Sequence, residues 1–394
     1  MISSKSNFYV PPGNYLGLLG GGQLGRMFCY SAQSLGYKVM VLDPDPDCPA
    51  GMVADHHIAA SYSDHNALEM LSKSCRSVTI EFENIPCNSL EILSKNCVVT
   101  PSAYSVSIAQ NRIKEKEFIQ SQGVDVAPYK SIFNGEDITE NIEYLLPGII
   151  KVSKTGYDGK GQAMVSSLEE VREVYYKFGE VPCVLERCLS INYEASVVLS
   201  RDFMGNSVFF PISTNVHNRG ILSSSLVIKN IDSSCEGHEK EQMLIKAKKI
   251  ADSLNYHGVL CVEFFVLNNS AIIINEIAPR PHNSGHYTID ACVDSQFDQQ
   301  VRVMAGLPLG STKLLTSALM LNILGDSWFD MDSGILRNPD WLDILSLPGV
   351  KLHLYGKKEA RPLRKMGHLT ILSDNINTLE DKAKIIAAKL NLSF

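Results

Sequence analysis

The N-terminal part of the chain alternates short apolar runs with segments of helical periodicity. Strands are expected at residues 15–19, 37–42 and 78–82, and a helix is expected at residues 26–35. Gly36 follows this helix directly, as glycine often does where a helix ends. Strands that alternate with helices are typical of a parallel sheet covered by helices. The pattern therefore predicts an α/β domain at residues 1–110.

Beyond residue 110 the pattern becomes that of an antiparallel sheet. A helix is expected at residues 111–123, and short apolar segments separated by turn residues follow it. The expected strands lie at residues 148–153, 184–186, 193–199, 207–212, 224–228, 259–267 and 318–324, and the expected helices at residues 237–254 and 295–305. We divide this part into an α+β body at residues 111–311 and a smaller tail at residues 312–394.

The sharpest change from apolar to polar positions lies within residues 271–286. Three isoleucines at positions 272–274 form a β-branched run that is typical of a buried strand. Polar and charged residues follow at once, namely Asn275, Glu276, Arg280, His282, Asn283 and His286. A rigid strand that ends in a polar cluster is a common place for chemistry. A strand that runs into an ordinary polar loop would not require an acid, two histidines and an arginine at one place.

The apolar strand at residues 259–267 contains one charged residue, Glu263, and a turn signal of two asparagines follows it. The two strands should therefore form a hairpin. A four-residue loop, 268–271, places Glu263 directly opposite Glu276, and a two-residue loop leaves them diagonal on one face. A three-residue loop places them on opposite faces, because side chains alternate along a strand.

Two carboxylates that face each other on an apolar sheet repel. Either a cation between them or a shared proton would remove the repulsion. Carboxylate oxygens are hard ligands that suit Mg²⁺, particularly where the ion is shared with phosphate groups. We therefore favour a metal site at Glu263 and Glu276 for Mg²⁺, with Mn²⁺ as an alternative ion, over a shared proton.

A glycine turn joins the first expected strand to the first expected helix. The spacing Gly20-x-Gly22-x-x-Gly25 matches the dinucleotide-binding fingerprint, and Asp43 lies near the position of a ribose-binding acid. The match is unspecific by itself, because similar turns hold many phosphorylated ligands or none. Glu81 and Glu83 lie at the end of a further strand, where an open α/β sheet binds ligands, but either acid could equally cap a helix or lie in solvent.

A second glycine-rich segment, at residues 156–162, reads Gly-Tyr-Asp-Gly-Lys-Gly-Gln and follows the strand that contains Lys151. Glycines allow backbone N–H groups to approach phosphate closely, and Lys160 adds a positive charge. We therefore expect a mobile flap over a phosphate group. Lys151 could point into the same site or extend its ammonium group to solvent.

Composition and charge mainly exclude classes of protein. The 394 residues are 45% hydrophobic and 20% charged, as in globular proteins, and a net charge of −7 argues against general nucleic-acid binding. Ten cysteines without Cys-x-x-Cys spacing are typical of reduced thiols in a cytoplasmic protein. No apolar run is long enough to span a membrane. Residues 1–13 lack the apolar core of a signal peptide, so we expect a loose extension there.

The tail contains a basic cluster that stands out in this acidic chain. Five of the nine residues at positions 357–365 are lysine or arginine. An anion site and a solvated basic turn explain this pattern equally well.

Four segments, in order, resemble one known family. They are Gly-Gly-Gly-Gln-Leu-Gly-Arg at 20–26, the flap at 156–162, Val-Glu-Phe-Phe-Val at 262–266 with the polar run at 275–286, and Arg-Lys-Met-Gly-His at 364–368. They are similar to the 5-(carboxyamino)imidazole ribonucleotide synthases, ATP-grasp enzymes of purine biosynthesis. The resemblance implies a Rossmann-like pre-ATP-grasp domain, an ATP-grasp body of two lobes around the nucleotide, and a small C-terminal β-rich domain.

The resemblance also implies a reaction and its partners. Bicarbonate would attack the γ-phosphoryl group of ATP, with Mg²⁺ bound, to give carboxyphosphate and ADP. The exocyclic amine of 5-aminoimidazole ribonucleotide would then capture carboxyphosphate or the CO₂ released from it. A homodimer and a separate mutase that receives the labile product are expected, as is a cytoplasmic location. Neither nucleic acid nor membrane is expected as a partner.

The resemblance assigns roles to residues along the whole chain. The ATP contacts would be Arg112, Lys151, the flap residues Gly156, Tyr157, Asp158, Gly159, Lys160, Gly161 and Gln162, the adenine hinge Glu186, Arg187, Cys188 and Leu189, the ribose acceptor Glu194, and His217, Asn275 and Glu276. The residues that handle bicarbonate or carry the catalytic step would be Asp158, Arg280, His282 and Lys365. The ribonucleotide would meet Gln23, Glu81, Tyr157, Asp158, Arg361, Arg364 and Lys365, and the metal ligands would be Glu263 and Glu276.

Three rival interpretations follow from parts of the same pattern. The glycine turn with Asp43 alone would suggest a dinucleotide-dependent oxidoreductase, which leaves the paired glutamates, the flap and the basic tail unexplained. A sister ATP-grasp enzyme, either the formate-dependent glycinamide ribonucleotide transformylase or a biotin carboxylase, would share the glutamates and the flap. A nucleotide-binding regulator without catalysis would not need an intact set of acids.

Overall fold

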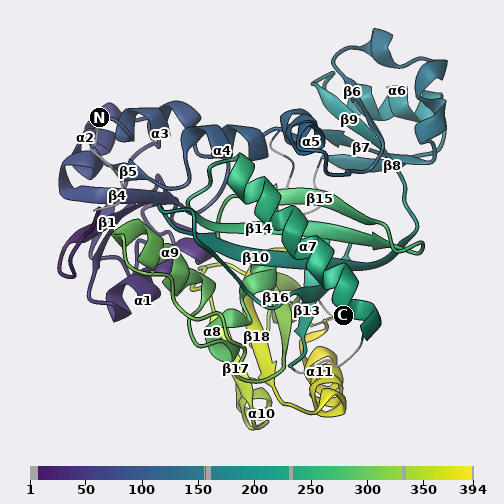
Figure 1. The fold of residues 1–394 in the computed structure, drawn as a ribbon. Coiled ribbons are helices and arrows are strands. Elements are labelled where there is room, and N and C mark those ends of the chain that lie inside the picture. The colour runs from purple at the N-terminus through teal and green to yellow at the C-terminus, as the bar shows by residue number, and fades with distance from the viewer. Residues whose placement is uncertain (1–7, 155, 157–160, 230–233, 331–333, 393–394) are drawn as a thin grey trace.

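The computed structural model describes residues 8–154, 156, 161–229, 234–330 and 334–392. These residues form three sheets, and Figure 1 shows an N-terminal α/β part, a large central sheet, and a small lobe that projects from one end. No helix in the described ranges combines the length and apolarity needed to cross a membrane.

The N-terminal part is a parallel sheet with strand order β3-β2-β1-β4-β5. Its strands are β1 (Tyr15–Leu19), β2 (Lys38–Leu42), β3 (His56–Ile58), β4 (Cys75–Ile80) and β5 (Val98–Val99), and its helices are α1 (Gln23–Ser34), α2 (His65–Ser74), α3 (Cys87–Leu93) and α4 (Ala103–Ala109). Alternate residues face opposite cores: Leu16 and Leu18 pack towards α1, whereas Leu19 packs towards α2 and α3. The structure therefore confirms the expected α/β arrangement.

The segment before β1 is docked, which corrects the expectation of a loose extension for residues 8–13. Val10 is fully buried, and its N–H donates to the Ala305 carbonyl at 2.9 Å. The Tyr37 hydroxyl donates to the Val10 carbonyl at 2.8 Å. Phe8 packs edge-on against Phe203 with ring centroids 5.7 Å apart. The partners that hold this segment come from distant parts of the chain, so its docking could not be predicted from its own residues.

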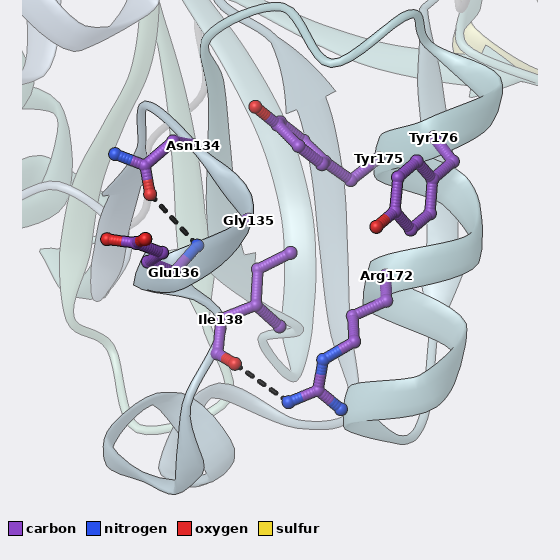
Figure 2. Close-up of a pocket in the computed structure, with 7 residues that line it drawn as sticks. All are labelled: Asn134, Gly135, Glu136, Ile138, Arg172, Tyr175 and Tyr176. Atoms are coloured by element: carbon purple, nitrogen blue, oxygen red, sulfur yellow. Dashed lines mark hydrogen bonds between the residues drawn. The ribbon is translucent and has the colours of Figure 1, made fainter.

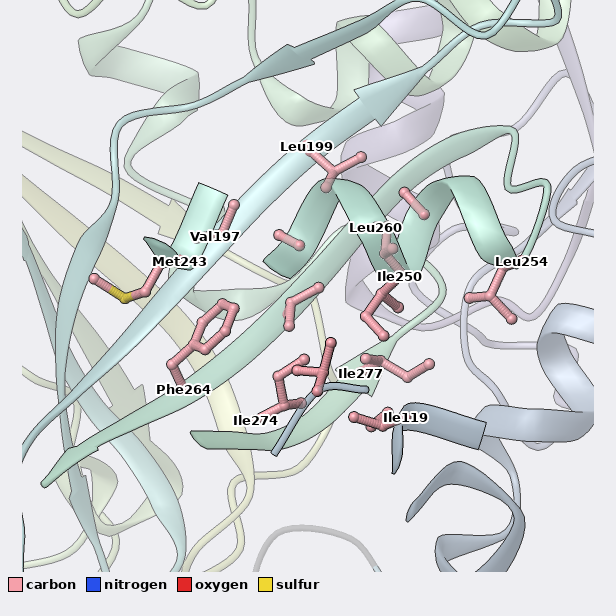
Figure 3. Close-up of a cluster of buried hydrophobic side chains, with 14 of the residues drawn as sticks. Ile119, Val197, Leu199, Met243, Ile250, Leu254, Leu260, Phe264, Ile274 and Ile277 are labelled. Carbon is pink, nitrogen blue, oxygen red and sulfur yellow. The ribbon is translucent and has the colours of Figure 1, made fainter. Parts of the chain in front are cut away.

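The body is organised around a large sheet with the path β15-β14-β10-β12-β13-β16-β18-β17, to which β11 adds by pairing with β10. The strands are β10 (Ile191–Arg201), β11 (Ser207–Phe209), β12 (Ser213–Asn218), β13 (Ile221–Val227), β14 (Gly258–Leu267) and β15 (Ile272–Ala278). The helices are α5 (Arg112–Ser121), α7 (Ser234–Ser253), α8 (Thr288–Ala291) and α9 (Gln296–Ala305), with a 3₁₀ turn at Asn283–Gly285. Figure 3 shows the core between α7, α5 and strands β10, β14 and β15, and α9 lies between this sheet and α1.

The small lobe is an antiparallel sheet of order β6-β9-β7-β8. Its strands are β6 (Tyr129–Ile132), β7 (Gly148–Val152), β8 (Gln162–Val165) and β9 (Cys183–Arg187), and its helices are α6 (Leu168–Lys177) and the 3₁₀ segments Gly135–Asp137 and Glu140–Leu145. It has a separate core, in which Val171 and Tyr175 of α6 pack against the sheet.

The C-terminal piece extends the central sheet instead of forming a separate one. Its elements are β16 (Ala318–Leu324), β17 (Val350–Leu354), β18 (Lys365–Leu372), α10 (Trp341–Leu345), α11 (Ile376–Leu390) and the 3₁₀ turn Gly325–Trp328. Strand β16 pairs with β13 of the body on one side and with β18 on the other. Trp328 and Trp341, with ring centroids 5.6 Å apart, pack against the core that α11 covers.

Candidate active site

One cavity of about 430 Å³ collects side chains from every part of the molecule. Twelve residues assigned from the sequence line it: Arg112, Lys151, Gly156, Gln162, Glu194, His217, Glu263, Asn275, Glu276, Arg280, His282 and Lys365. Strands β14 and β15 form one wall, the small lobe contributes Lys151, and the C-terminal piece contributes Lys365. Residues far apart in the sequence therefore meet at one site.

Glu263 and Glu276 face each other, although the loop between their strands is the one of the three considered lengths that would not place them so. The loop has three residues, 268–270: the Leu267 N–H donates to the Ala271 carbonyl, and Val266 pairs with Ile272. Such a loop alone would put the two acids on opposite faces. A β-bulge at Asn275 inserts one residue between the pairs Phe264–Ile274 and Glu263–Glu276, and this shift restores the facing arrangement.

The two carboxyls have opposite electrostatic settings. Burial and the nearby charge of Glu276 raise the pKa of Glu263 to about 7, and its Oε1 lies 3.1 Å from His282 Nε2. Burial alone would also raise the pKa of Glu276, but Arg112, 3.0 Å from its Oε2, outweighs burial and lowers it. The pair thus carries one firm negative charge and one that a cation would stabilise.

Two lysines and a glutamate form a buried ion cluster at the small-lobe end of the cavity. Glu186 lies between Lys151, 3.0 Å from its Oε2, and Lys116, 3.2 Å from its Oε1. Burial opposes its charge, but the two lysines lower the pKa of Glu186 to about 2. Lys116 was not singled out from the sequence. Its spacing of four residues from Arg112 puts both cations on one face of α5, and this signal could have revealed it.

His217 and Glu194 form a pair on neighbouring strands of the central sheet. His217 Nδ1 lies 2.5 Å from Glu194 Oε2. Burial would lower the pKa of His217, but its bond to Glu194 outweighs burial and raises the pKa. The strand that carries His217, β12, was not expected from the sequence.

At the other end of the cavity, Arg280 is held by the N-terminal part. Its Nε donates to Glu83 Oε2 at 2.6 Å, and its Nη1 donates to the Pro281 carbonyl at 3.1 Å. Burial opposes the charge of Glu83, but Arg280 lowers its pKa overall. Glu83 was noted as a polar residue at a strand end without a role. It is the contact through which the N-terminal part orients the guanidinium group.

His282 and Lys365 complete this end. Burial, followed by the charges of Arg280 and Lys365, lowers the pKa of His282 well below its usual range. Its Nδ1 lies 2.8 Å from Ser284 Oγ, and Gln296 brackets its backbone by accepting from the N–H and donating to the carbonyl. A cavity with cations at both ends and facing acids on one wall can hold a nucleoside triphosphate and a small anion together.

The comparisons with known proteins point to one family. Models of the ribonucleotide synthetase pre-ATP-grasp domain, the ATP-grasp domain and the phosphoribosylaminoimidazole carboxylase C-terminal domain match residues 14–110, 117–297 and 318–382. N5-carboxyaminoimidazole ribonucleotide synthases from Staphylococcus aureus (strain COL) and Bacillus subtilis (strain 168) are 39% and 38% identical to this chain. The alignments cover 93% and 94% of this chain and 95% and 93% of those proteins.

The chain belongs to the N5-carboxyaminoimidazole ribonucleotide synthase family.

Solved structures of the same family agree. An N5-carboxyaminoimidazole ribonucleotide synthetase in complex with ADP superposes with a TM-score of 0.89 and 40% identity, covering 96% of this chain and 98% of that one. The Aspergillus clavatus enzyme in complex with ADP and 5-aminoimidazole ribonucleotide has a TM-score of 0.85 and 28% identity, covering 96% of this chain and 98% of that one.

In this synthase the glycine turn is occupied by the protein's own acids, so it does not present a free dinucleotide site. Glu81 accepts hydrogen bonds from the N–H groups of Gly22 at 2.9 Å and Leu24 at 3.2 Å. Asp43 accepts from the Gly21 N–H at 2.7 Å. A Cβ at Gly22 would lie 2.2 Å from Glu81 Oε1, so the turn needs glycine because this carboxylate approaches closely. The oxidoreductase interpretation is therefore wrong.

The other residues assigned from the sequence lie outside the cavity lining. Gln23 begins α1, beside the turn that Glu81 caps. In the hinge, the N–H groups of Arg187 and Cys188 donate to the carbonyls of Pro128 and Pro147, so these two donors are already used. Leu189 is half-buried. Tyr157, Asp158, Gly159 and Lys160 of the flap lie outside the described residues, whereas Gly161 adopts φ +70° against Val152.

The basic tail separates into three environments. Lys365 lines the cavity. Arg364 is half-buried, and its Nη1 donates to the Glu359 carbonyl at 2.9 Å. Arg361 is exposed and pairs with the Glu359 carboxylate at 2.6 Å. The cluster is therefore not a uniform patch, and only one of its cations reaches the cavity directly among the three assigned to the substrate.

A second hollow, on the small lobe, holds none of the assigned residues. Figure 2 shows its lining, which includes Asn134, Arg172 and Tyr176, and it encloses about 590 Å³. Arg172 donates to the Ile138 carbonyl at 2.8 Å within this hollow. It lacks facing acids and a cluster of cations, so the first cavity is the candidate active site.

Proposed function

We propose that this chain uses ATP and bicarbonate to carboxylate the exocyclic amine of 5-aminoimidazole ribonucleotide, and that the cavity at β14 and β15 is where this happens. One observation carries the proposal. The same cavity is lined by the facing carboxylates, by the cations Lys151 and Arg112, and by a second group of cations around His282. The relatives' names and the ligands in their structures support the choice of substrates.

Mg²⁺ fits the two facing glutamates. Burial and repulsion raise the pKa of Glu263 to about 7, so a divalent cation would stabilise its charged form. Within the described residues no group of three or more acids, histidines or cysteines is arranged to hold a metal ion, so phosphate oxygens and water would supply the remaining ligands. Mg²⁺ or Mn²⁺ at this site would neutralise charge on the transferred phosphoryl group.

The cations at the small-lobe end would position the triphosphate. Lys151 and Arg112 line the cavity, where they pair with Glu186 and Glu276. Lys151 can turn towards phosphate without leaving Glu186 unpaired, because Lys116 also pairs with that carboxylate. Glu194 would accept hydrogen bonds from the ribose hydroxyls, and His217 would hold Glu194 in place. Phosphoryl transfer depends chiefly on such positioning.

At the other end, Arg280 and Lys365 would hold bicarbonate beside the γ-phosphoryl group. Attack by a bicarbonate oxygen breaks the bond from the γ-phosphorus to the bridging oxygen and gives carboxyphosphate and ADP. The amine of the ribonucleotide then attacks the carboxyl carbon, and phosphate leaves as the amine loses a proton. The imidazole of His282, which burial keeps neutral, can donate a hydrogen bond to the carboxyl group from Nε2, because its Nδ1 accepts from the Ser284 N–H at 3.3 Å.

Several finer features remain part of the proposal. Arg361, Arg364, Gln23, Glu81, Tyr157 and Asp158 would contact the ribonucleotide, the segment 156–162 would close over the phosphates, and residues 186–189 would contact adenine. The protein would act as a homodimer in the cytoplasm and pass its labile product to a separate mutase.

The test is a purified-protein assay for ADP release and for the carboxylated ribonucleotide. ADP release should require Mg²⁺ and bicarbonate and should rise when 5-aminoimidazole ribonucleotide is added. Replacing this substrate with glycinamide ribonucleotide and formate should give no product. Product from formate, or none from bicarbonate, would remove the proposal.

A further inference from the structure

Three histidine rings form a stack at the junction between the C-terminal piece and the body. His353 on β17 lies opposite His368 on β18, with ring centroids 4.5 Å apart and planes at 14°. His368 also stacks on His286, with centroids 4.6 Å apart and planes at 28°. His286 belongs to the polar run after β15, so the stack joins two parts of the chain that are far apart in sequence.

Each outer ring is anchored to the body by one hydrogen bond. His353 Nε2 lies 2.8 Å from Asp290 Oδ2 on α8. Gln296 Nε2 lies 3.2 Å from His286 Nδ1. These contacts fix the orientation of the rings at both ends of the stack.

His368 and His286 are buried with one ring nitrogen each left without a hydrogen bond to any described residue, which costs stability. Tyr355 Oη lies 3.0 Å from His368 Nδ1. The Nε2 atoms of His286 and His368 are buried and have no hydrogen-bond partner among the residues that the structure describes. An unpartnered buried nitrogen destabilises a fold relative to an apolar side chain of similar shape. Core packing alone therefore does not account for histidine at these two positions.

The stack connects the two segments that carry Lys365, proposed to hold bicarbonate, and His282, proposed to contact the carboxyl group. A bulge at Met366 shifts the pairing of β18 with β16, so Lys365 lies on the same face of the strand as His368. On the other side, Gln296 holds both the His286 ring and the backbone of His282. One ring is thus tied to the strand that carries Lys365, and the next ring is tied to the turn that carries His282.

We propose that His286 and His368 are positioning residues, whose ring contact fixes the Lys365 ammonium group relative to the His282 imidazole. This inference rests on the proposed function and assigns to it two residues that do not touch substrate. Lys365 and His282 come from different parts of the fold, and the stack is the rigid contact that sets the distance between them. Misplacing a positioned group by about 1 Å can cost roughly a hundredfold in rate.

The test compares His368→Ala with Leu369→Ala. Leu369 is the next residue on β18, is fully buried, and faces the core under α11. Both substitutions remove a buried side chain from one strand, but only the first removes the stack. The readouts are the carboxylated product formed per ATP hydrolysed, the KM for bicarbonate and the KM for ATP.

His368→Ala should reduce product per ATP and raise the KM for bicarbonate by roughly tenfold, while the KM for ATP changes by less than about twofold. Leu369→Ala should lower the melting temperature but form as much product per ATP hydrolysed as the wild type, a ratio that we call coupling. His368→Phe, which keeps a flat ring at the contact, should restore coupling to within about threefold of wild type. If His368→Ala does not fold, the Phe variant and His286→Ala carry the same comparison.

A double variant tests the contact itself. If the two rings act through each other, the double variant with His286→Ala and His368→Ala should form no less product per ATP hydrolysed than either single variant. Coupling in His368→Ala equal to that in Leu369→Ala, equal rises in both KM values, or additive losses in the double variant would overturn the inference. A wild-type protein that forms no carboxylated product would instead refute the proposed function.

Discussion

Glu276 is the residue on which the metal assignment can be tested most directly. Its carboxylate faces Glu263 and bonds to Arg112, so Glu276→Gln keeps the shape of the site and removes one charge. We expect turnover to fall at least about a hundredfold, or about 2.7 kcal/mol, because the proposed metal ion would lose one of its two carboxylate ligands. ADP release measures this, and a circular dichroism melt checks the fold. Wild-type turnover at saturating Mg²⁺ would contradict the assignment.

Arg364 and Lys365 are adjacent but should fail in different ways. Arg364→Ala should raise the KM for 5-aminoimidazole ribonucleotide roughly ten- to a hundredfold, since loss of a charge-assisted contact to phosphate costs about 1.5–3 kcal/mol. Lys365 lines the cavity, so Lys365→Ala should mainly lower kcat or release ADP without product. Steady-state kinetics with each substrate varied in turn separates the two.

Lys351→Ala is the matched control, because this lysine is exposed on β17 of the same piece. Its removal should change neither constant by more than about twofold, as for ordinary surface charges. A rise in the KM for ATP alone in Arg364→Ala would assign the basic tail to the nucleotide.

Individual elements show how far sequence patterns reach. The run at 15–19 became β1 with the same bounds, because an apolar strand between turn residues has few alternatives. The sequence left the loop length between the two glutamate strands open at two, three or four residues. The bulge at Asn275, which makes the observed three-residue loop compatible with facing glutamates, could not be predicted, because hydrophobic alternation does not reveal an inserted residue. Glu81 capping the glycine turn depends on two segments 59 positions apart, so local reading could not distinguish it from a ligand site.

The docked segment before β1 gives a prediction at the level of one element. Val10 is fully buried between α9 and Tyr37, so Val10→Asp places a charge without a partner in the core. The free energy of unfolding should fall by roughly 3 kcal/mol. Tyr9→Asp is the control, because 46% of this neighbouring side chain's surface is exposed and its variant should unfold nearly as the wild type does. Urea unfolding of both variants measures the difference, and equal midpoints would show that the segment is not docked in solution.

The molecule as a whole places the site where its parts meet. Glu83 comes from the N-terminal part, Glu263 and Glu276 from the body, and Lys365 from strands that continue the body's sheet. The sequence predicted which of the assigned residues would gather there better than it predicted their partners. Lys116, Glu83 and the histidine stack act through contacts between distant segments, which no local pattern encodes.

The buried histidines give the whole fold a measurable pH dependence. Burial lowers the pKa of His286 and His368 well below the usual range, so both rings stay neutral when folded, whereas the unfolded chain binds protons below pH of about 6.5. Each ring's contribution is fully present above that pH and falls by about 1.4 kcal/mol per unit below it. Glu115 and Glu263, whose pKa values burial raises to about 8 and about 7, act in the opposite sense.

Comparison with His368→Phe isolates one ring, because the glutamates contribute equally to both proteins. Between pH of about 6 and 5, the wild type should lose about 1.2 kcal/mol more stability than the variant. Urea unfolding at several pH values measures this, and parallel curves would mean that His368 takes up a proton in the folded protein.

The paired rings of Trp328 and Trp341 have a spectroscopic consequence. They are the only two tryptophans in the sequence, and both lie in the C-terminal piece. Intrinsic tryptophan emission therefore reports on that piece alone, while circular dichroism reports on every helix and strand. Coincident unfolding curves from the two signals would show that the pairing of β13 with β16 makes the molecule a single cooperative unit. A change in emission at lower denaturant would show that the C-terminal piece unfolds first.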